Sequence, residues 1–395
     1  MAKNQNTNQQ YENEQKRSRY SDYERYTWRY QLKRLPWLLL IPLGLFIPRL
    51  AGGHAEQIER YYSRMIYPYI AKGLGFASHF VQFSIAEIVV IIIVTVFAFL
   101  LLIRLLRLIF GRLLERKRNR VRLFSLIISL LIFAGVMLNL FYALWGLNHF
   151  RQPLNNLMAL EVHERSSDEL ASACELLASE AAELRKNCPE DQNGVFKLDR
   201  EAALKGIRDA YLKLGTENEL FANKAYPAKT VLLSMLLSRL NIAGIYSPYT
   251  SEANVNAEQP DLYFAAGAAH ESAHYFGFAR EDEADFIAYF VSLYSDDPAI
   301  RYSAVMLALN YCGHALDGCD HDRYKEIVQT LYTPEMVRDV LNYNEYYEKY
   351  ADKPAAKAND IVNDTYLKHN GQSAGVNSYG NMVDLLLAFL ATQGN

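Results

Sequence analysis

Two histidines and a glutamate near the middle of the chain have the spacing of a metal-dependent hydrolase site. The run His270-Glu271-Ser272-Ala273-His274 places two imidazoles four residues apart. On a helix both project from one face and can bind one metal ion. Glu271 can reach a water molecule held in the open position of that metal and act as general base. These residues predict one zinc ion per chain, with hydrolysis as its chemistry.

The next residues supply a third ligand and a supporting carboxylate. Gly277 can end the first helix, so that the chain turns back and presents Glu281 from a second helix. Asp285 lies one turn beyond Glu281, where it can accept the ring N–H of a ligating histidine. Glu281 is preferred to Glu283 as the ligand because only Glu281 has an aspartate four residues later. The alternative is a buried helix whose two histidines are only structural.

The H-E-x-x-H motif with a downstream E-x-x-x-D resembles the gluzincin zinc metallopeptidases. Many gluzincins have a longer insertion than this chain, in which Glu281 follows His274 by seven residues. The resemblance implies three zinc ligands, a catalytic base and a supporting carboxylate: His270, His274 and Glu281, then Glu271, then Asp285.

A wider resemblance rests on segments on both sides of the metal motif. Residues 247–256 (SPYTSEANVN) precede the motif, and residues 363–368 (NDTYLK) and 375–380 (GVNSYG) follow it. Together with apolar segments upstream, they are similar to a bacterial family of membrane proteins known only as a domain of unknown function. This resemblance implies a shared architecture and no particular substrate.

The first part of the chain has the composition of a membrane anchor. Residues 1–34 are polar and predict a disordered tail. The first apolar segment is short and contains three prolines, so an uncleaved signal anchor is the alternative to a full span. We expect a membrane domain over residues 35–149 with three transmembrane helices, at about 35–51, 85–110 and 123–146.

Positive charge predicts the orientation of these spans. Residues 111–122 hold six Lys or Arg, whereas residues 52–82 hold three. Positively charged loops stay on the cytoplasmic side, so the tail and residues 111–122 are expected inside. Residues 150–395 then lie outside the plasma (inner) membrane. The side is the same if the first apolar segment does not span.

The four cysteines all follow the last apolar segment. An even number confined to an exported domain indicates disulfides. The nearest pairs in sequence are Cys174–Cys188 and Cys312–Cys319. Seven residues of continuous helix span about 10 Å, so the second pair requires the chain to leave the helix. Four free buried thiols are the alternative.

The exported domain is expected to be α-rich with a small sheet, which makes the whole chain mainly α with a zincin-like C-terminal part. Residues 167–186 and 199–214 have helical spacing, with Asp199 placed to cap the second helix. Residues 244–256 contain β-branched and aromatic side chains interrupted by Pro248, which suits an edge strand or an extended segment.

Further residues are candidates for binding the substrate. An edge strand beside a metal can bind an extended peptide by strand addition, and we expect Glu252, Ala253 and Asn254 to do so. A structural loop is the alternative. A peptidase also needs a hydrogen-bond donor for the oxyanion of the scissile carbonyl. His369 and Tyr379 are the expected donors, His369 as a cation and Tyr379 from a turn between two glycines.

The sequence thus predicts a membrane-anchored zinc peptidase that cleaves peptide or protein substrates on the outer face. The net charge of −3 gives no indication of a nucleic-acid partner. One alternative is an intramembrane protease with residues 262–279 as a span, although flanking acidic residues make this costly. The other is a non-catalytic receptor or assembly factor with a structural metal, which would need a fourth protein ligand and no use for Glu271.

Overall fold

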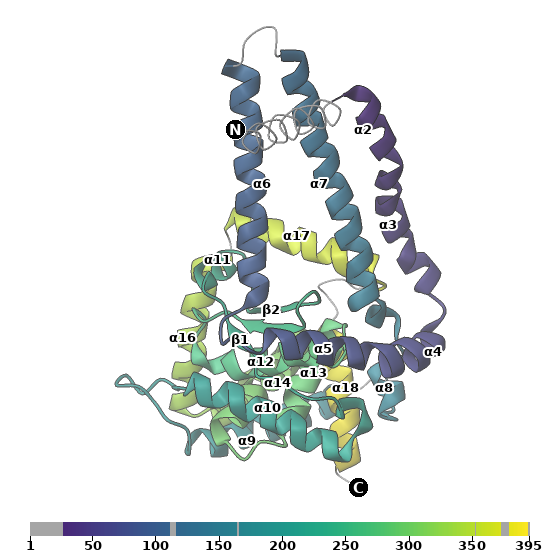
Figure 1. The fold of residues 1–395 in the computed structure, drawn as a ribbon. Coiled ribbons are helices and arrows are strands. Elements are labelled where there is room, and N and C mark those ends of the chain that lie inside the picture. Colours follow the sequence, from purple (N-terminus) through teal and green to yellow (C-terminus); the bar gives the residue numbers. More distant parts are fainter. Residues whose placement is uncertain (1–26, 111–115, 164–165, 352, 373–378, 394–395) are drawn as a thin grey trace, which may run out of the picture. The chain divides into compact units, whose positions relative to one another are not determined.

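The computed structural model describes residues 27–110, 116–163, 166–351, 353–372 and 379–393, and it is mainly helical with one small sheet (Figure 1). This confirms the expected mainly α fold. The chain divides into two compact units. One combines the described residues up to Ile47 with Ile88–Ala143, and the other combines Pro48–Glu87 with the described residues from Leu144 onward. The units divide the chain at other points than the predicted domains, whose boundaries stay predictions.

Three helical stretches are long and apolar enough to cross a membrane: Trp28–Ala51, Ile85–Phe110 and Arg118–Leu144. They coincide with the three apolar segments of the sequence. The first starts earlier than expected, because Thr27 Oγ1 caps helix α2 (Trp28–Arg34) by accepting the Tyr30 N–H at 3.3 Å. Residues 1–26 of the predicted tail lie outside the described part of the chain.

Polar side chains join the first helical stretch to the third. Arg34 donates from its guanidinium to Ser125 Oγ at 3.1 Å and to Ser129 Oγ at 2.7 Å. Asn139 Nδ2 donates to the Leu40 carbonyl oxygen at 2.7 Å. Hydrogen bonds of this kind, made between apolar helices, hold such helices together where water is scarce. The helices of this unit are α2, a 3₁₀ turn at Leu35–Leu39, α3 (Leu40–Ala51), α6 (Ile85–Phe110) and α7 (Arg116–Leu144).

The segment between the first two apolar helices is itself helical. It contains α4 (Ala55–Gln57), a π-helix at Ile58–Ile66 and α5 (Tyr67–Ser78). Tyr67 is completely buried, and its hydroxyl donates to the Tyr275 carbonyl oxygen at 2.8 Å. Residues 52–82 were expected to form a loop, but this helical segment belongs to the same compact unit as the C-terminal part of the chain.

A buried ion pair joins the π-helix to the segment after the third apolar helix. Arg151 donates to both carboxylate oxygens of Glu59 at 2.7 and 2.9 Å, and to the Gly277 carbonyl oxygen at 3.0 Å. Burial by itself raises the pKa of Glu59, but Arg151 and Arg64 outweigh that effect and lower the pKa below 4.5. The ionised pair thus fixes the end of the helix that carries the metal motif.

We expect Glu59→Ala to lower the free energy of unfolding by about 3–5 kcal/mol, because Arg151 stays buried without its partner. The contribution of Glu59 is present above its unfolded-state pKa of 4.5 and is lost as the pH falls through the lower folded-state pKa. Denaturant unfolding of the full chain in detergent at pH 7 and at low pH measures both effects. Glu201→Ala, in an exposed pair with Lys205, is the control and should cost less than about 1 kcal/mol. An equal loss in both variants would contradict the prediction.

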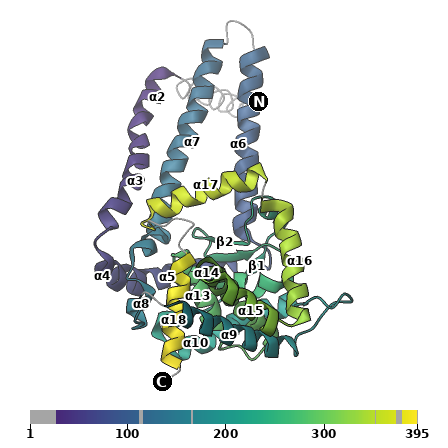
Figure 2. The same ribbon diagram turned by 180° about the vertical axis from the view of Figure 1, so that it is seen from behind.

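The C-terminal unit is built around α14 (Pro298–Cys319), which packs against α9, α12, α13, α15 and α18 (Figure 2). The two helices expected early in this unit are confirmed, and Asp199 caps the second by accepting the Ala202 N–H. The helices besides α14 are α8 (Leu154–Leu157), α9 (Ser167–Arg185), α10 (Arg200–Glu217), α11 (Ser234–Arg239), α12 (Phe264–Tyr275), α13 (Glu281–Ser292), α15 (His321–Leu331), α16 (Pro334–Ala351), α17 (Pro354–His369) and α18 (Tyr379–Gln393).

All four cysteines are free thiols in the structure. Helix α14 runs unbroken through Cys312 and Cys319, so the local pair cannot form for the geometric reason given above. Cys312 instead lies in hydrogen-bonding contact with Cys174 of α9. The neighbouring thiols therefore come from two packed helices rather than from one stretch of sequence.

The sheet has three strands, β1 (Lys229–Thr230), β2 (Gly244–Ser247) and β3 (Glu252–Val255), in the order β1-β3-β2. Strand β3 pairs in parallel with β1 and antiparallel with β2. The prediction that residues 252–254 form an edge is therefore wrong, because both sides of β3 are occupied by ladder hydrogen bonds. The edge strand of the expected segment is β2.

Candidate metal centre

Helices α12 and α13 form a tight hairpin that brings the predicted ligands together. Gly277 has a φ of +82°, a left-handed conformation that glycine adopts without steric cost. The Gly277 N–H donates to the His274 carbonyl oxygen at 3.0 Å, and the Phe278 N–H donates to that of Ala273 at 3.2 Å. This confirms that Gly277 ends the first helix. Glu281 is the first residue of α13, where the helix dipole favours a carboxylate.

Three side chains converge at this hairpin. Glu281 Oε2 lies 3.1 Å from His270 Nε2 and 3.8 Å from His274 Nε2. The ligand atoms of all three residues lie within 4.8 Å of one another. A tetrahedral zinc ion with bonds near 2.0–2.1 Å holds its ligands about 3.3 Å apart. The residues present therefore fit zinc.

The other nitrogen of each imidazole is already used. His270 Nδ1 lies 2.6 Å from Asp285 Oδ1, and His274 Nδ1 lies 2.7 Å from the Phe278 carbonyl oxygen. Neither oxygen can donate, so each Nδ1 carries a proton, and Nε2 is the nitrogen of each ring that is placed to bind a metal beside Glu281. Tyr311 donates to the second oxygen of Asp285 at 2.7 Å. No sequence motif predicted that Tyr311 or the Phe278 carbonyl oxygen would hydrogen-bond to the site.

Electrostatics keep the third ligand ionised. Burial raises the pKa of Glu281, but His274 and His270 outweigh that effect and lower it to about 2. Burial likewise lowers the pKa of His270, but Asp285 and Glu281 raise it well above its ordinary value. Burial lowers the pKa of His274. An ionised carboxylate close to two imidazole nitrogens can bind a divalent cation together with them.

We expect Asp285→Asn to weaken zinc binding about 10- to 100-fold, the usual effect of removing a carboxylate that orients a ligating histidine. Competition with a chromogenic chelator measures the affinity. Asp209→Asn, which changes an exposed residue of α10, is the matched control. Unchanged affinity in Asp285→Asn would show that the hydrogen bond at 2.6 Å has no part in metal binding.

The side chain of Glu271, a residue of α12, contacts the edge strand β2. Burial raises its pKa to about 8, and a backbone hydrogen bond from Tyr246 of β2 counteracts part of that rise. A Cβ atom on Gly244 would lie 2.6 Å from both Cγ and Oε1 of Glu271. Any larger residue at position 244 would therefore clash with the Glu271 side chain. Glu283 is engaged elsewhere, since its Oε1 accepts from Leu154 N at 2.8 Å and from Arg280 at 2.7 Å.

Residues 62–387 match the model of a protein family described as "Protein of unknown function (DUF3810)". The chain belongs to this family. No curated protein and no solved structure matches the chain. The matched DUF3810 region begins in the π-helix and ends in α18, so it includes the hairpin and its three candidate ligands. The predicted resemblance to a family of unknown function is confirmed, and the gluzincin resemblance stays a prediction.

Residues that the sequence analysis did not assign to the site also contact it in this DUF3810 protein. Trp145 Nε1 donates to the His274 carbonyl oxygen at 2.8 Å, and its ring lies 5.7 Å from the His274 ring. The His149 ring lies 5.1 Å from Trp145, and His149 Nε2 lies 2.8 Å from the Tyr366 hydroxyl. Burial lowers the pKa of His149 to about 3, with further effects from Glu281 and His274. Trp145 and His149 are four residues apart, but both lie far along the chain from His274 and Tyr366, so no local sequence signal connects them to the site.

Of the two predicted oxyanion donors in this DUF3810 chain, the structure describes the side chain of only one. His369 is the last residue of α17, and it is exposed. Within the described ranges, no hydrogen bond or ion pair joins it to the three ligands. Tyr379 begins α18, but its side chain lies outside the part of the chain that the structure describes. Both catalytic roles stay predictions.

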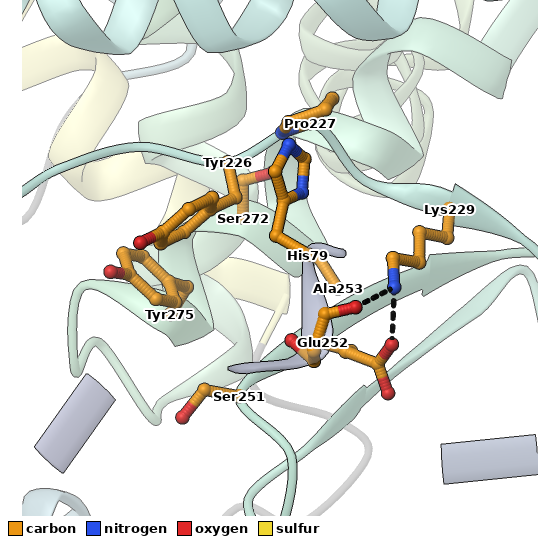
Figure 3. A pocket seen from close by; sticks show the side chains of 10 residues that line it. His79, Tyr226, Pro227, Lys229, Ser251, Glu252, Ala253, Ser272 and Tyr275 are labelled. Atoms are coloured by element: carbon orange, nitrogen blue, oxygen red, sulfur yellow. Dashed lines mark hydrogen bonds and ion pairs between the residues drawn. The ribbon is translucent and has the colours of Figure 1, made fainter. Parts of the chain in front are cut away.

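The predicted substrate-binding residues of this DUF3810 protein are buried and make structural contacts. Glu252 pairs with Lys229 Nζ at 2.6 Å, and Figure 3 shows this contact. The Glu252 carboxylate also accepts from Ile85 N at 3.0 Å and Ala86 N at 2.8 Å, and so caps the start of α6. Asn254 Nδ2 donates to the Glu252 carbonyl oxygen at 3.0 Å, and Ala253 is buried. These contacts favour the structural alternative.

Proposed function

We propose that the protein is a membrane-anchored zinc peptidase that hydrolyses peptide bonds on the outer face of the membrane. The observation that carries the proposal is the convergence of His270 Nε2 and His274 Nε2 on Glu281 Oε2, with both Nδ1 atoms held by acceptors. This is a preformed set of three ligands. It would leave a tetrahedral metal one open position, as in catalytic rather than structural sites.

The chain's own residues have distinct roles in the proposed reaction. A zinc ion bound there would supply a Lewis acid and lower the pKa of a water molecule to about 7. Glu271 takes a proton from the attacking water and passes it to the leaving amine. The hydrogen-bonded pair His149 and Tyr366 is a further candidate donor to the carbonyl oxygen of the substrate.

The edge strand β2 is the element that we propose lies beside the extended substrate. Tyr246 N, on the side of β2 away from β3, already reaches Glu271, so a peptide added to this edge would run past the general base. Gly244, also in β2, has no side chain that would keep Glu271 away from this strand. Strand β2 therefore replaces β3 in the substrate-binding role predicted from the sequence.

We expect Gly244→Ala to reduce peptide hydrolysis at least about tenfold, because its methyl group would lie 2.6 Å from the Glu271 carboxylate and displace it. Initial rates with one peptide, together with zinc content, measure the effect. Gly73→Ala is the matched control, since a Cβ at Gly73 meets nothing within 4 Å. Full activity in Gly244→Ala would contradict the proposed position of Glu271.

Two observations weigh against the alternatives. Helix α12 has 12 residues, which is shorter than the roughly 20 that a transmembrane helix needs, and this argues against an intramembrane protease. In the described part of the chain, the group of possible ligands contains three residues and no fourth His, Cys, Asp or Glu. A closed structural site would need that fourth ligand.

The test of the proposal uses the full chain purified in detergent. Zinc content and cleavage of a defined peptide mixture are measured before chelation, after chelation and after zinc is restored. One zinc ion per chain with cleavage that follows the zinc content is the expected result. Firmly bound zinc without cleavage would favour a receptor or assembly factor, and a chain that binds no zinc would overturn the proposal.

A further inference from the structure

A cavity of about 490 Å³ in the C-terminal unit has a positively charged lining. Its volume falls within the roughly 300–1,000 Å³ that is usual for small-molecule sites. Its charged side chains come from the last turn of α3, the residue before α13 and the end of α17. No acidic residue lines it within the described ranges. The basic side chains of the lining are Arg49, Arg280, Lys368 and His369, and the neutral wall includes His149 and Phe150.

The basic side chains differ in how far their charge is compensated. Arg280 is held by Glu283 at 2.7 Å and by the Arg151 carbonyl oxygen at 2.7 Å. Lys368 pairs with Asp364 at 2.8 Å but is 53% exposed, so water screens this pair. Arg49 is exposed and makes no hydrogen bond or ion pair with the described residues. The cavity therefore has an uncompensated positive charge at its mouth.

The rim of the cavity follows directly from the first apolar helix, which ends at Ala51. If that helix crosses a membrane, its end lies at the level of the lipid headgroups. The turn after it contains two glycines, and a Cβ on Gly53, whose φ is +94°, would meet nothing within 4 Å. Gly52 and Gly53 therefore line the cavity next to Arg49 without side chains that would fill it.

We propose that this cavity binds the phosphate of an anionic phospholipid headgroup. The Arg49 guanidinium presents a planar fork that matches two phosphate oxygens, and the Lys368 ammonium adds a point charge. The cavity contains none of the three proposed zinc ligands, but its wall shares His149 with the proposed peptidase site, so the test changes only Arg49 and Lys368 and reads out binding rather than hydrolysis. A soluble phosphate compound or a peptide carboxylate has related chemistry, and the experiment distinguishes these sources.

The experiment uses the full chain in detergent with four probes at equal concentration and constant ionic strength: dihexanoylphosphatidylglycerol, dihexanoylphosphatidylcholine, inorganic phosphate and an acetylated dipeptide. The rise in the thermal unfolding midpoint with concentration gives each affinity. We expect phosphatidylglycerol to bind best, and its affinity to fall at least about tenfold in Arg49→Gln/Lys368→Gln. Lys205→Gln is the matched control, because Lys205 is exposed and pairs with Glu201 at the same helical spacing as Lys368 with Asp364.

Each outcome decides for or against the proposal. Equal affinities of the double variant and the wild type for phosphatidylglycerol would overturn the site. Inorganic phosphate or the dipeptide binding as well as phosphatidylglycerol would overturn the lipid as its occupant. The single variant Arg49→Gln changes one exposed side chain without a described partner, and it provides the same comparison if the double variant does not fold.

Discussion

Glu271→Gln is expected to reduce peptide hydrolysis about 10²- to 10⁴-fold while the chain retains its zinc, because a general base contributes a rate factor of this size. Glutamine keeps the length of the side chain, and its carbonyl oxygen can still accept the backbone hydrogen bond from Tyr246. The three ligands are unchanged, so metal binding should persist. Initial rates with a single peptide and zinc content by atomic absorption are the measurements.

Glu201→Gln is the control for this variant, since Glu201 is an exposed residue of α10. Two results would contradict the prediction. Hydrolysis at the wild-type rate would remove Glu271 from the reaction. Zinc lost together with activity would mean that Glu271 serves the metal rather than the attacking water.

Glu281→Ala is expected to remove stoichiometric zinc, with a loss of affinity greater than the roughly 10- to 100-fold predicted for Asp285→Asn. The change deletes both a ligand and the negative charge that faces His270 and His274 at 3.1 and 3.8 Å. Only two imidazoles would remain, and these cannot complete the set of three that catalytic zinc sites use. Equilibrium dialysis with a zinc buffer measures the affinity.

Glu326→Ala, at an exposed position of α15, is the control for Glu281→Ala. A folded Glu281→Ala chain that keeps one tightly bound zinc ion would show that another residue is the third ligand. Together, Glu271→Gln and Glu281→Ala test zinc binding and peptide hydrolysis separately. A protein that needs Glu281 for zinc but performs no reaction requiring Glu271 would be a receptor or assembly factor.

Features that depend on residues close together in the chain could be predicted before the fold was known. The four-residue spacing of His270 and His274 sets one helical face, Gly277 sets the end of that helix, and the next four-residue interval aligns Glu281 with Asp285. Apolar runs likewise set the three helices that are long enough to span a membrane. These features are encoded within one or two helical turns, so local geometry suffices to predict them.

Contacts between segments that are distant in the chain could be read only from the folded structure. Strand β3 was expected at an edge but is central, because the two-residue strand β1 pairs with it from a separate part of the chain. Residues 52–82 were expected to form a loop between spans, yet Tyr67 is buried and donates to the Tyr275 carbonyl oxygen of α12. His149 and Tyr366 meet across more than 200 residues. Such contacts depend on which surfaces are buried together, and burial is a property of the whole fold that no short window of sequence contains.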